Sequence, residues 1–373
     1  MTVDTIALSR EELAEFGAAL RQRKEQVYAL LADEKYRRML QPAEIYDGAA
    51  LYLQRTGKAL RPVYLLWCAG ATGGAERELL GLLPAAAVET YHTWGLVHDD
   101  IIDMDEIRRG GPTVHKLFEA RALAEKGYSP EDATRFGVAM AILAGDALMA
   151  WTMALLSELY DVAEVDPALP RYFIREISQR QIPTLIDGEI TDVMLEKADV
   201  RQIDTQTLLE MSYKKTGSIF AFAGAMGAMI GLNRADPEHP YVVALDGFAH
   251  KSGLAFQLID DVINIAGSPE TIGKPVGSDI VIGKRTLPIL HALRHARGSD
   301  EAALRAVFGN AEATPEQVEA AIEAVKRSGG LDTTREIAFG MVREAFDHLA
   351  VVPQGPYHRL IELLGRRLVD RQI

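Results

Sequence analysis

Three aspartates interrupt the otherwise apolar segment HTWGLVHDDIID. On a helix, Asp99 and Asp103 project from one face and Asp100 lies beside them. Like charges placed together cost stability unless a cation lies between them, and oxygen ligands that leave room for water and phosphate suit Mg²⁺. The sequence therefore predicts a magnesium site. The alternative is that these acids form the solvated end of a helix.

Arg108 and Arg109 follow the last of these aspartates within about one and a half helical turns. A fixed pair of cations thus stands next to an anionic cluster. Because arginine pairs bidentately with phosphate oxygens, carboxylates, a divalent metal and arginine side chains together predict a diphosphate site.

A second pair of acids, Asp260 and Asp261, lies in the apolar segment GLAFQLIDDVINIAG. This pair predicts a second wall that binds metal. One turn after Asp260 stands Asn264 rather than a third aspartate, which removes a charge but keeps an amide oxygen able to reach a metal-bound water. Alone, this pattern is weak, and a capped or salt-bridged pair would also explain it.

Further cations accompany the two acidic clusters. Lys58 and Arg61 lie three residues apart in TGKALRP, on the first turn of an expected helix, which suits one more anion. Lys215 lies in YKKTGSIF, and Lys274 and Lys284 lie in a glycine-rich segment whose backbone can approach a ligand closely. Each lysine alone would be read as a solvated surface charge, so their occurrence together with the acid pairs carries the argument.

The composition sets limits on the class of protein. The chain has 373 residues, of which 48% are hydrophobic, and a formal net charge of −13, so binding to nucleic acid is not expected. Cys68 is the single cysteine, which excludes an intrachain disulfide and fits a cytoplasmic location. Acidic or basic residues interrupt every apolar stretch before it reaches the roughly 20 residues of a membrane span, so none is expected.

Apolar residues recur at three-to-four spacing in nearly every segment, and proline and glycine fall mostly between these segments. This pattern predicts an all-α helical bundle. The segments Ala85 to Asp105 and Ala133 to Leu159 are apolar around most of their circumference, so we expect neighbours on all their sides. No linker divides the chain, which predicts one domain over residues 1–373.

These features resemble the trans-isoprenyl diphosphate synthases of the polyprenyl synthetase family. The matching motifs run in order from Gly57 to Leu290: GKALRP, HDDIIDMDEIRRG, LAGDAL, GEITD, KTG, FQLIDDVIN, and GKPVGSD followed by GKRTLP. The resemblance implies an isoprenoid-synthase bundle with a deep central cavity, a homodimer, and condensation of isopentenyl diphosphate with an allylic diphosphate.

The resemblance also assigns roles to residues. Asp99, Asp103 and Asp260 would hold Mg²⁺, with Asp100 and Asp261 supporting them. The allylic diphosphate would be bound by Arg108, Lys215, Thr216, Gln257, Lys274 and Lys284, and isopentenyl diphosphate by Lys58, Arg61, His92 and Arg109. Diphosphate leaves once its charge is neutralised, the allylic cation is attacked by the isopentenyl double bond, and a proton is lost, so no nucleophilic side chain is required.

Three questions stay open at the level of sequence. Trp94 lies five residues before Asp99 and Tyr91 about one turn further, which in this family resembles enzymes that make C15 or C20 products; alternatively, both rings only pack against neighbouring helices. A terpene cyclase of the same fold would not need the cations assigned to isopentenyl diphosphate. A noncatalytic partner subunit has only Asn264 in its favour.

Overall fold

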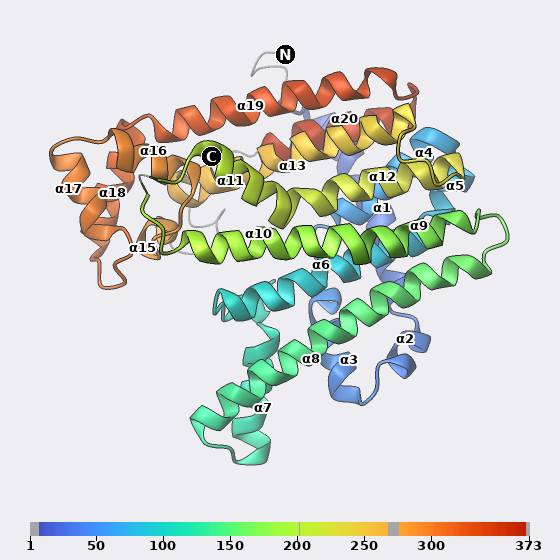
Figure 1. The fold of residues 1–373 in the computed structure, drawn as a ribbon, viewed down its shortest axis with the longest axis horizontal. Coiled ribbons are helices and arrows are strands. Elements are labelled where there is room, and N and C mark those ends of the chain that lie inside the picture. The colour runs from blue at the N-terminus through green and yellow to red at the C-terminus, as the bar shows by residue number, and fades with distance from the viewer. Residues whose placement is uncertain (1–6, 201, 268–275, 371–373) are drawn as a thin grey trace.

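The fold is a bundle of α-helices (Figure 1), taken from a computed structural model that describes residues 7–200, 202–267 and 276–370. The first half contains the helices α1 (Arg10–Leu31), α2 (Glu34–Met39), α3 (Ala43–Gln54), α4 (Leu60–Gly73), α5 (Ala75–Leu80), α6 (Leu82–Ile102), α7 (Val114–Lys126), α8 (Pro130–Ser157), α9 (Ala168–Glu176) and α10 (Ile182–Leu195). The second half contains α11 (Thr205–Ser212), α12 (Ser218–Leu232), α13 (Pro240–Ala266), α15 (Ser278–Val281), α16 (Leu287–His295), α17 (Ser299–Val307), α18 (Pro315–Arg327), α19 (Gly330–His348) and α20 (Pro356–Val369).

The all-α prediction is confirmed. Among the described residues, the only strands are β1 (Ile107–Arg108) and β2 (Gly111–Pro112), which form a small antiparallel hairpin after α6. Local sequence signals begin several helices: the side chain of Ser9 accepts from the third backbone N–H of α1 in a capping box, and Ser129 caps α8 just before a proline at its first position. The hairpin turns the chain back so that Arg108 meets Asp100 near the end of α6 and Arg109 meets Glu89 in its first half.

The core lies between α4, α6, α12 and α13. Helix α12 is buried along nearly its whole length, and it packs on α4 through close backbone approaches: an added Cβ at Gly227 would lie 2.2 Å from the carbonyl oxygen of Leu65. In Figure 1, α10 crosses the bundle parallel to α12 and α13, with α6 behind it. These helices therefore form the walls of the interior.

Helix α8 differs from the prediction that it has neighbours on all its sides. Ile142 and Leu143, which lie on one face, expose 44% and 49% of their surface. By length and composition alone, α8 with the residues that follow it, Pro130–Asp161, could cross a membrane, and so could the segment Thr205–Leu232, although no such stretch was expected. Within the apolar 18-residue window of each segment, 83% of the second is buried, as in the core helix of a soluble protein, and 39% of the first is buried.

Two irregular features position polar side chains near the bundle interior. The turn η4 (Tyr213–Gly217), between α11 and α12, is π-helical, a form that concentrates at functional sites. Thr56, Ala59 and Arg109 have positive φ angles of 36°, 56° and 51°, so the backbone is strained on both sides of Lys58 and at Arg109 itself. The prediction that Lys58 lies on the first turn of a helix was wrong: Lys58 lies just before α4, which begins at Leu60.

Candidate active site

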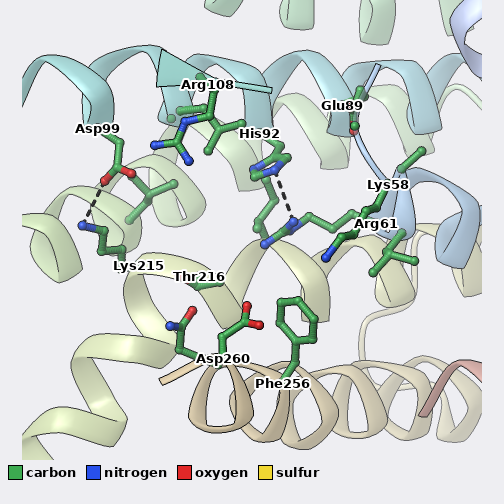
Figure 2. Close-up of a pocket in the computed structure, with 18 of the residues that line it drawn as sticks. Lys58, Arg61, Glu89, His92, Asp99, Arg108, Lys215, Thr216, Phe256 and Asp260 are labelled. Carbon is green, nitrogen blue, oxygen red and sulfur yellow. Dashed lines mark hydrogen bonds and ion pairs between the residues drawn. The ribbon is translucent and has the colours of Figure 1, made fainter. Parts of the chain in front are cut away.

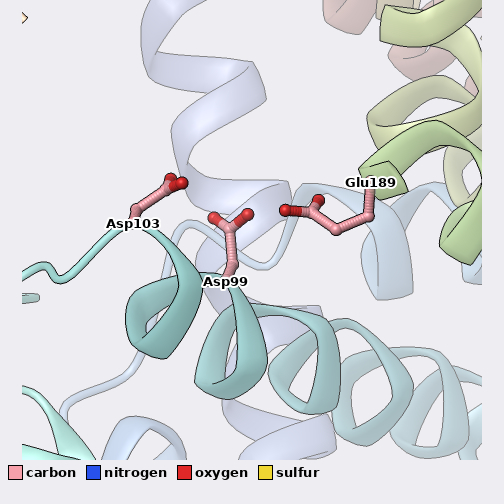
Figure 3. A group of neighbouring side chains, drawn as sticks. All are labelled: Asp99, Asp103 and Glu189. Carbon is pink, nitrogen blue, oxygen red and sulfur yellow. The ribbon is translucent and has the colours of Figure 1, made fainter. Parts of the chain in front are cut away.

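The first acidic wall is formed by the last turn of α6 and by α10. Carboxylate oxygens of Asp99, Asp103 and Glu189 lie within 4.8 Å of one another (Figure 3). Hard carboxylate oxygens at this spacing fit a divalent cation such as Mg²⁺. The residues present therefore suit the metal that the sequence predicts, and Glu189 adds a carboxylate that the sequence reading did not assign.

The electrostatics of this wall agree with a cation site. Burial, together with the nearby carboxylate of Asp99, raises the pKa of Asp103 to about 6. Burial and the charge of Asp99 together thus outweigh the ammonium groups of Lys215 and Lys284, which favour the ionised form. A divalent cation between the two carboxylates would remove their repulsion.

Asp100 faces away from that cluster. It is fully buried, and it accepts hydrogen bonds from the hydroxyl of Tyr52 and from Nε of Arg108, the latter at 2.7 Å. Arg108 Nη2 also lies 2.9 Å from Asp105 Oδ2. Burial raises the pKa of Asp100, while the guanidinium opposes the shift. Asp100 thus holds Arg108 against the end of α6.

Lys215 reaches the same wall from the π-helical turn η4. Its Nζ lies 2.9 Å from Asp99 Oδ1, 3.0 Å from Glu189 Oε2 and 2.7 Å from Asp192 Oδ2. Close packing makes this possible, because an added Cβ at Gly188 would lie 2.5 Å from the backbone nitrogen of Lys215. The motif GEITD therefore has a physical reason: glycine lets α10 approach η4, and the two acids meet the lysine.

The second acidic wall is on α13. Asp260 lines the main cavity, and Asp261 is buried and accepts a hydrogen bond of 3.1 Å from Gln257. Burial raises the pKa of Asp261 to about 7, and the positive charge of Lys284 opposes the shift. Asn264 follows on the same helix. Lys274 lies outside the described residues.

The predicted isopentenyl diphosphate cations gather at the other end of the cavity (Figure 2). Arg61 Nη1 lies 3.3 Å from His92 Nε2, and the ammonium of Lys58 lies 5.7 Å from the ring centre of Phe256. Burial, together with the charges of Arg61 and Arg109, lowers the pKa of His92, so its imidazole is neutral near pH 7. It can therefore accept a hydrogen bond from Arg61.

A buried carboxylate that the sequence reading missed lies among these cations. Glu89 is 1% exposed, and its Oε1 lies 3.5 Å from Arg109 Nη2 and accepts a hydrogen bond of 2.6 Å from the Tyr28 hydroxyl. That hydroxyl accepts a hydrogen bond of 2.9 Å from the backbone of Gly57. One acid thus ties α1, the loop before α4 and the hairpin arginine to α6.

One cavity of about 690 Å³ joins the first acidic wall, the second and the cationic end. The predicted residues that line it are Lys58, Arg61, His92, Asp99, Arg108, Arg109, Lys215, Thr216, Gln257 and Asp260. A smaller cavity of about 180 Å³ beside it is lined by Asp99, Asp103, Asp192, Asp261 and Lys284. The structure thus brings together every predicted metal-binding and diphosphate-binding residue that it describes.

Trp94 and Tyr91 are not among the residues that line the main cavity. Their rings stack on each other with centroids 5.5 Å apart, and Trp94 also meets the edge of the His98 ring. On the neighbouring face of α6, Gly95 and Leu96 line the cavity. A role of the Trp94–Tyr91 pair in chain length stays a prediction, because the pair could act only from behind the wall.

Comparison with known proteins places this site in a family. The family model described as Polyprenyl synthetase matches residues 43–325. A geranylgeranyl pyrophosphate synthase of Geoglobus acetivorans is 32% identical over 348 residues, which cover 92% of this chain and 97% of the relative. A farnesyl diphosphate synthase of Geobacillus stearothermophilus is 36% identical over 262 residues, covering 69% of this chain and 78% of the relative.

A solved structure agrees. The geranylgeranyl pyrophosphate synthase of Corynebacterium glutamicum, complexed with isoprenyl diphosphate and magnesium, has a TM-score of 0.79 and 27% sequence identity, covering 96% of this chain and 99% of that one. The chain therefore belongs to the polyprenyl synthetase family and is a prenyltransferase that makes linear trans-prenyl diphosphates. The family and the isoprenoid-synthase fold predicted from the sequence are confirmed.

Proposed function

We propose that this prenyltransferase condenses isopentenyl diphosphate with an allylic diphosphate in a Mg²⁺-dependent reaction that stops at C15 or C20. The observation that carries this proposal is the layout of the main cavity, which has carboxylates on two facing walls and a separate group of cations at its other end. Two anionic substrates need two such sites, whereas a cyclase needs one.

Asp99 and Asp103 on one wall and Asp260 on the other would hold the metal. When bound, Mg²⁺ would neutralise charge on the diphosphate that leaves. The carboxylate cluster of the first wall supports this assignment, as does the magnesium in the related synthase from Corynebacterium glutamicum. Asp100 and Asp261 would act by orienting Arg108 and Gln257, to which they are hydrogen-bonded.

The remaining polar side chains would divide between the two substrates. Arg108, Lys215, Thr216, Gln257 and Lys284 line the cavities next to the carboxylates, so they would contact the allylic diphosphate. Lys274 shares that expectation from the sequence. Isopentenyl diphosphate would bind at the far end, to Lys58, Arg61, His92 and Arg109.

The chemistry then needs only positioning and charge. The allylic C–O bond breaks, and its electrons go to the diphosphate. The double bond of isopentenyl diphosphate supplies the electrons of the new C–C bond, and the proton then lost from carbon is accepted by the released diphosphate. Arg108 and Lys215 stabilise charge that grows on the leaving group, so they act on the transition state more than on the bound substrate.

Incubation of the purified protein with labelled isopentenyl diphosphate, Mg²⁺ and dimethylallyl, geranyl or farnesyl diphosphate tests this function. We expect linear products that end at C15 or C20. Cyclic hydrocarbon formed from the allylic substrate alone would identify a cyclase. Diphosphate binding without condensation would identify a noncatalytic subunit, the reading for which Asn264 is the sequence evidence.

Product length provides a first prediction. If the Trp94–Tyr91 stack closes the end of the cavity, replacing Trp94 by alanine opens space along α6, and the main product should lengthen by at least one isoprene unit. Chromatography of dephosphorylated products measures this. The matched variant is Leu96→Ala, on the wall itself. Longer products from Leu96→Ala but not from Trp94→Ala would show that the stack only packs.

We also propose a homodimer through the exposed face of α8. Ile142 and Leu143 are 44% and 49% exposed and lie on one side of the helix with the exposed Ala139, Asp146 and Ala150. Exposed apolar side chains grouped in this way mark interaction surfaces. A second copy of the chain would cover the same face by two-fold symmetry.

The cytoplasmic location expected from the sequence stays a prediction.

Light scattering after size exclusion tests the dimer. We expect the unmodified protein at twice the chain mass of 40.9 kDa and Leu143→Glu at the chain mass, because a carboxylate would be buried in the interface. The matched control is Leu79→Glu on α5, since Leu79 is 55% exposed and lies outside this face. A dimer that survives Leu143→Glu would place the interface elsewhere.

A further inference from the structure

The ammonium of Lys215 lies where three carboxylates converge. The ammonium donates hydrogen bonds to Glu189 and Asp192, whose oxygens lie at 3.0 and 2.7 Å, and it forms an ion pair with Asp99 Oδ1 at 2.9 Å. Burial by itself lowers the pKa of Lys215, but these three carboxylates raise it above the ordinary value. The lysine is therefore a fixed positive charge held inside the acidic wall.

Two of these carboxylates also belong to the candidate metal cluster. Asp99 and Glu189 share with Asp103 the arrangement in which ligand oxygens lie within 4.8 Å of one another (Figure 3). The lysine contact uses Asp99 Oδ1, an oxygen of the same carboxylate that would face a metal. A divalent cation and the ammonium therefore need the same side chain.

We propose that Lys215 and Mg²⁺ compete for Asp99, and that Glu189 and Asp192 are positioning residues which hold the ammonium when Asp99 turns to the metal. The two acids come from α10 whereas Asp99 comes from α6, so the ammonium keeps two partners after it loses the third. It then stays beside the metal, where a diphosphate oxygen can become its new partner.

This exchange couples metal binding to diphosphate binding. A diphosphate that draws the ammonium toward itself frees Asp99, so it raises the affinity for metal, and linkage requires that metal raise the affinity for diphosphate equally. Lys284 lines the smaller cavity together with Asp192 and Asp261, and these carboxylates raise its pKa against the effect of its burial. A second buried ammonium thus lies near the carboxylates of both walls.

The inference rests on the proposed metal site, but its test does not require turnover. Calorimetric titration of metal-stripped protein with Mn²⁺, without diphosphate, should show Lys215→Met binding on the order of tenfold more tightly than the unmodified protein, because a competing charge is gone. The titration is then repeated with inorganic pyrophosphate present. The increase in metal affinity that pyrophosphate causes should be on the order of tenfold smaller in the variant than in the unmodified protein.

The matched control is Lys214→Met, since Lys214 is the adjacent residue and pairs with Asp187 at 2.6 Å outside the metal cluster. It should leave metal affinity unchanged. If circular dichroism shows that Lys215→Met is misfolded, Lys215→Gln is used in its place. Metal affinity that is unchanged or lower in a folded Lys215 variant would overturn the proposal. If the unmodified protein catalyses no condensation but Lys215→Met still binds metal more tightly, the proposed function is refuted and this competition stands.

A double-mutant cycle separates positioning from direct metal binding by Glu189. As a single substitution, Glu189→Gln should weaken Mn²⁺ binding, because the ammonium of Lys215 then holds Asp99 more firmly. In the Lys215→Met background the same change should alter affinity by less than about threefold, since no ammonium remains to be redirected. Equal losses in both backgrounds would make Glu189 a metal ligand and overturn its positioning role.

Discussion

Asp103→Asn should lower kcat/KM for condensation by a factor on the order of a thousand, the scale of a lost catalytic electrostatic interaction. The change keeps the size of the side chain but removes one of the carboxylates that lie within 4.8 Å of one another on the first wall. The loss should be smaller at high Mg²⁺ concentration, because weaker metal binding is part of the effect. Steady-state rates over a range of Mg²⁺ concentrations measure both components.

The matched control for Asp103→Asn is Asp187→Asn. Asp187 is on α10, with 57% of its side chain exposed, and it pairs with Lys214 rather than with the cluster. Loss of a solvated carboxylate there should change kcat/KM by less than about twofold. An Asp103→Asn variant with normal rates at low Mg²⁺ would remove Asp103 from the metal site.

Much of the fold could be predicted because helical periodicity is a local property. Apolar spacing gave the all-α class, and α6 and α13 lie where the two acidic pairs require helices. The prediction that α8 has neighbours on all its sides was wrong because periodicity reports only how apolar a helix is. It does not report whether another helix or a second protein chain covers each face.

The candidate site could be predicted where charge interrupts an apolar segment. Asp99, Asp103 and Asp260 are conspicuous for that reason, since an acid within an apolar helix is costly unless it has a partner. Glu189 and Asp192 are on α10 beside exposed residues, where acids are ordinary. What distinguishes them is Gly188, which admits the backbone of η4, and this close approach is a property of the folded chain. The signal available was the spacing of GEITD itself.

Glu89 could not be assigned from sequence for a related reason. Its partners come from distant segments: Tyr28 from α1 and Arg109 from the hairpin. Three segments of chain meet at one carboxylate only because α1 packs along α6. The strained backbone at Thr56 and Ala59 is likewise fixed by this packing, not by the local residue types.

A carboxylate remote from the acidic walls should limit stability. Asp246 on α13 is partly buried, and this burial, together with the negative charge of Glu176, raises its pKa to about 6, although Arg180 opposes the shift. The native state therefore binds a proton more tightly than the unfolded chain does. The resulting stabilisation is complete below the unfolded pKa of 3.8 and is lost as the pH rises through about 6.

Asp246→Asn should consequently raise the free energy of unfolding by about 2 kcal/mol at pH 7.5, and the gain should shrink as the pH falls from about 6 toward 4. Urea denaturation at both ends of this range measures it. The matched control is Asp236→Asn, since Asp236 pairs with the exposed Arg234 at 3.2 Å and its loss should not help the fold. A gain independent of pH would assign the effect to packing, because only the ionised carboxylate carries the cost that protonation removes.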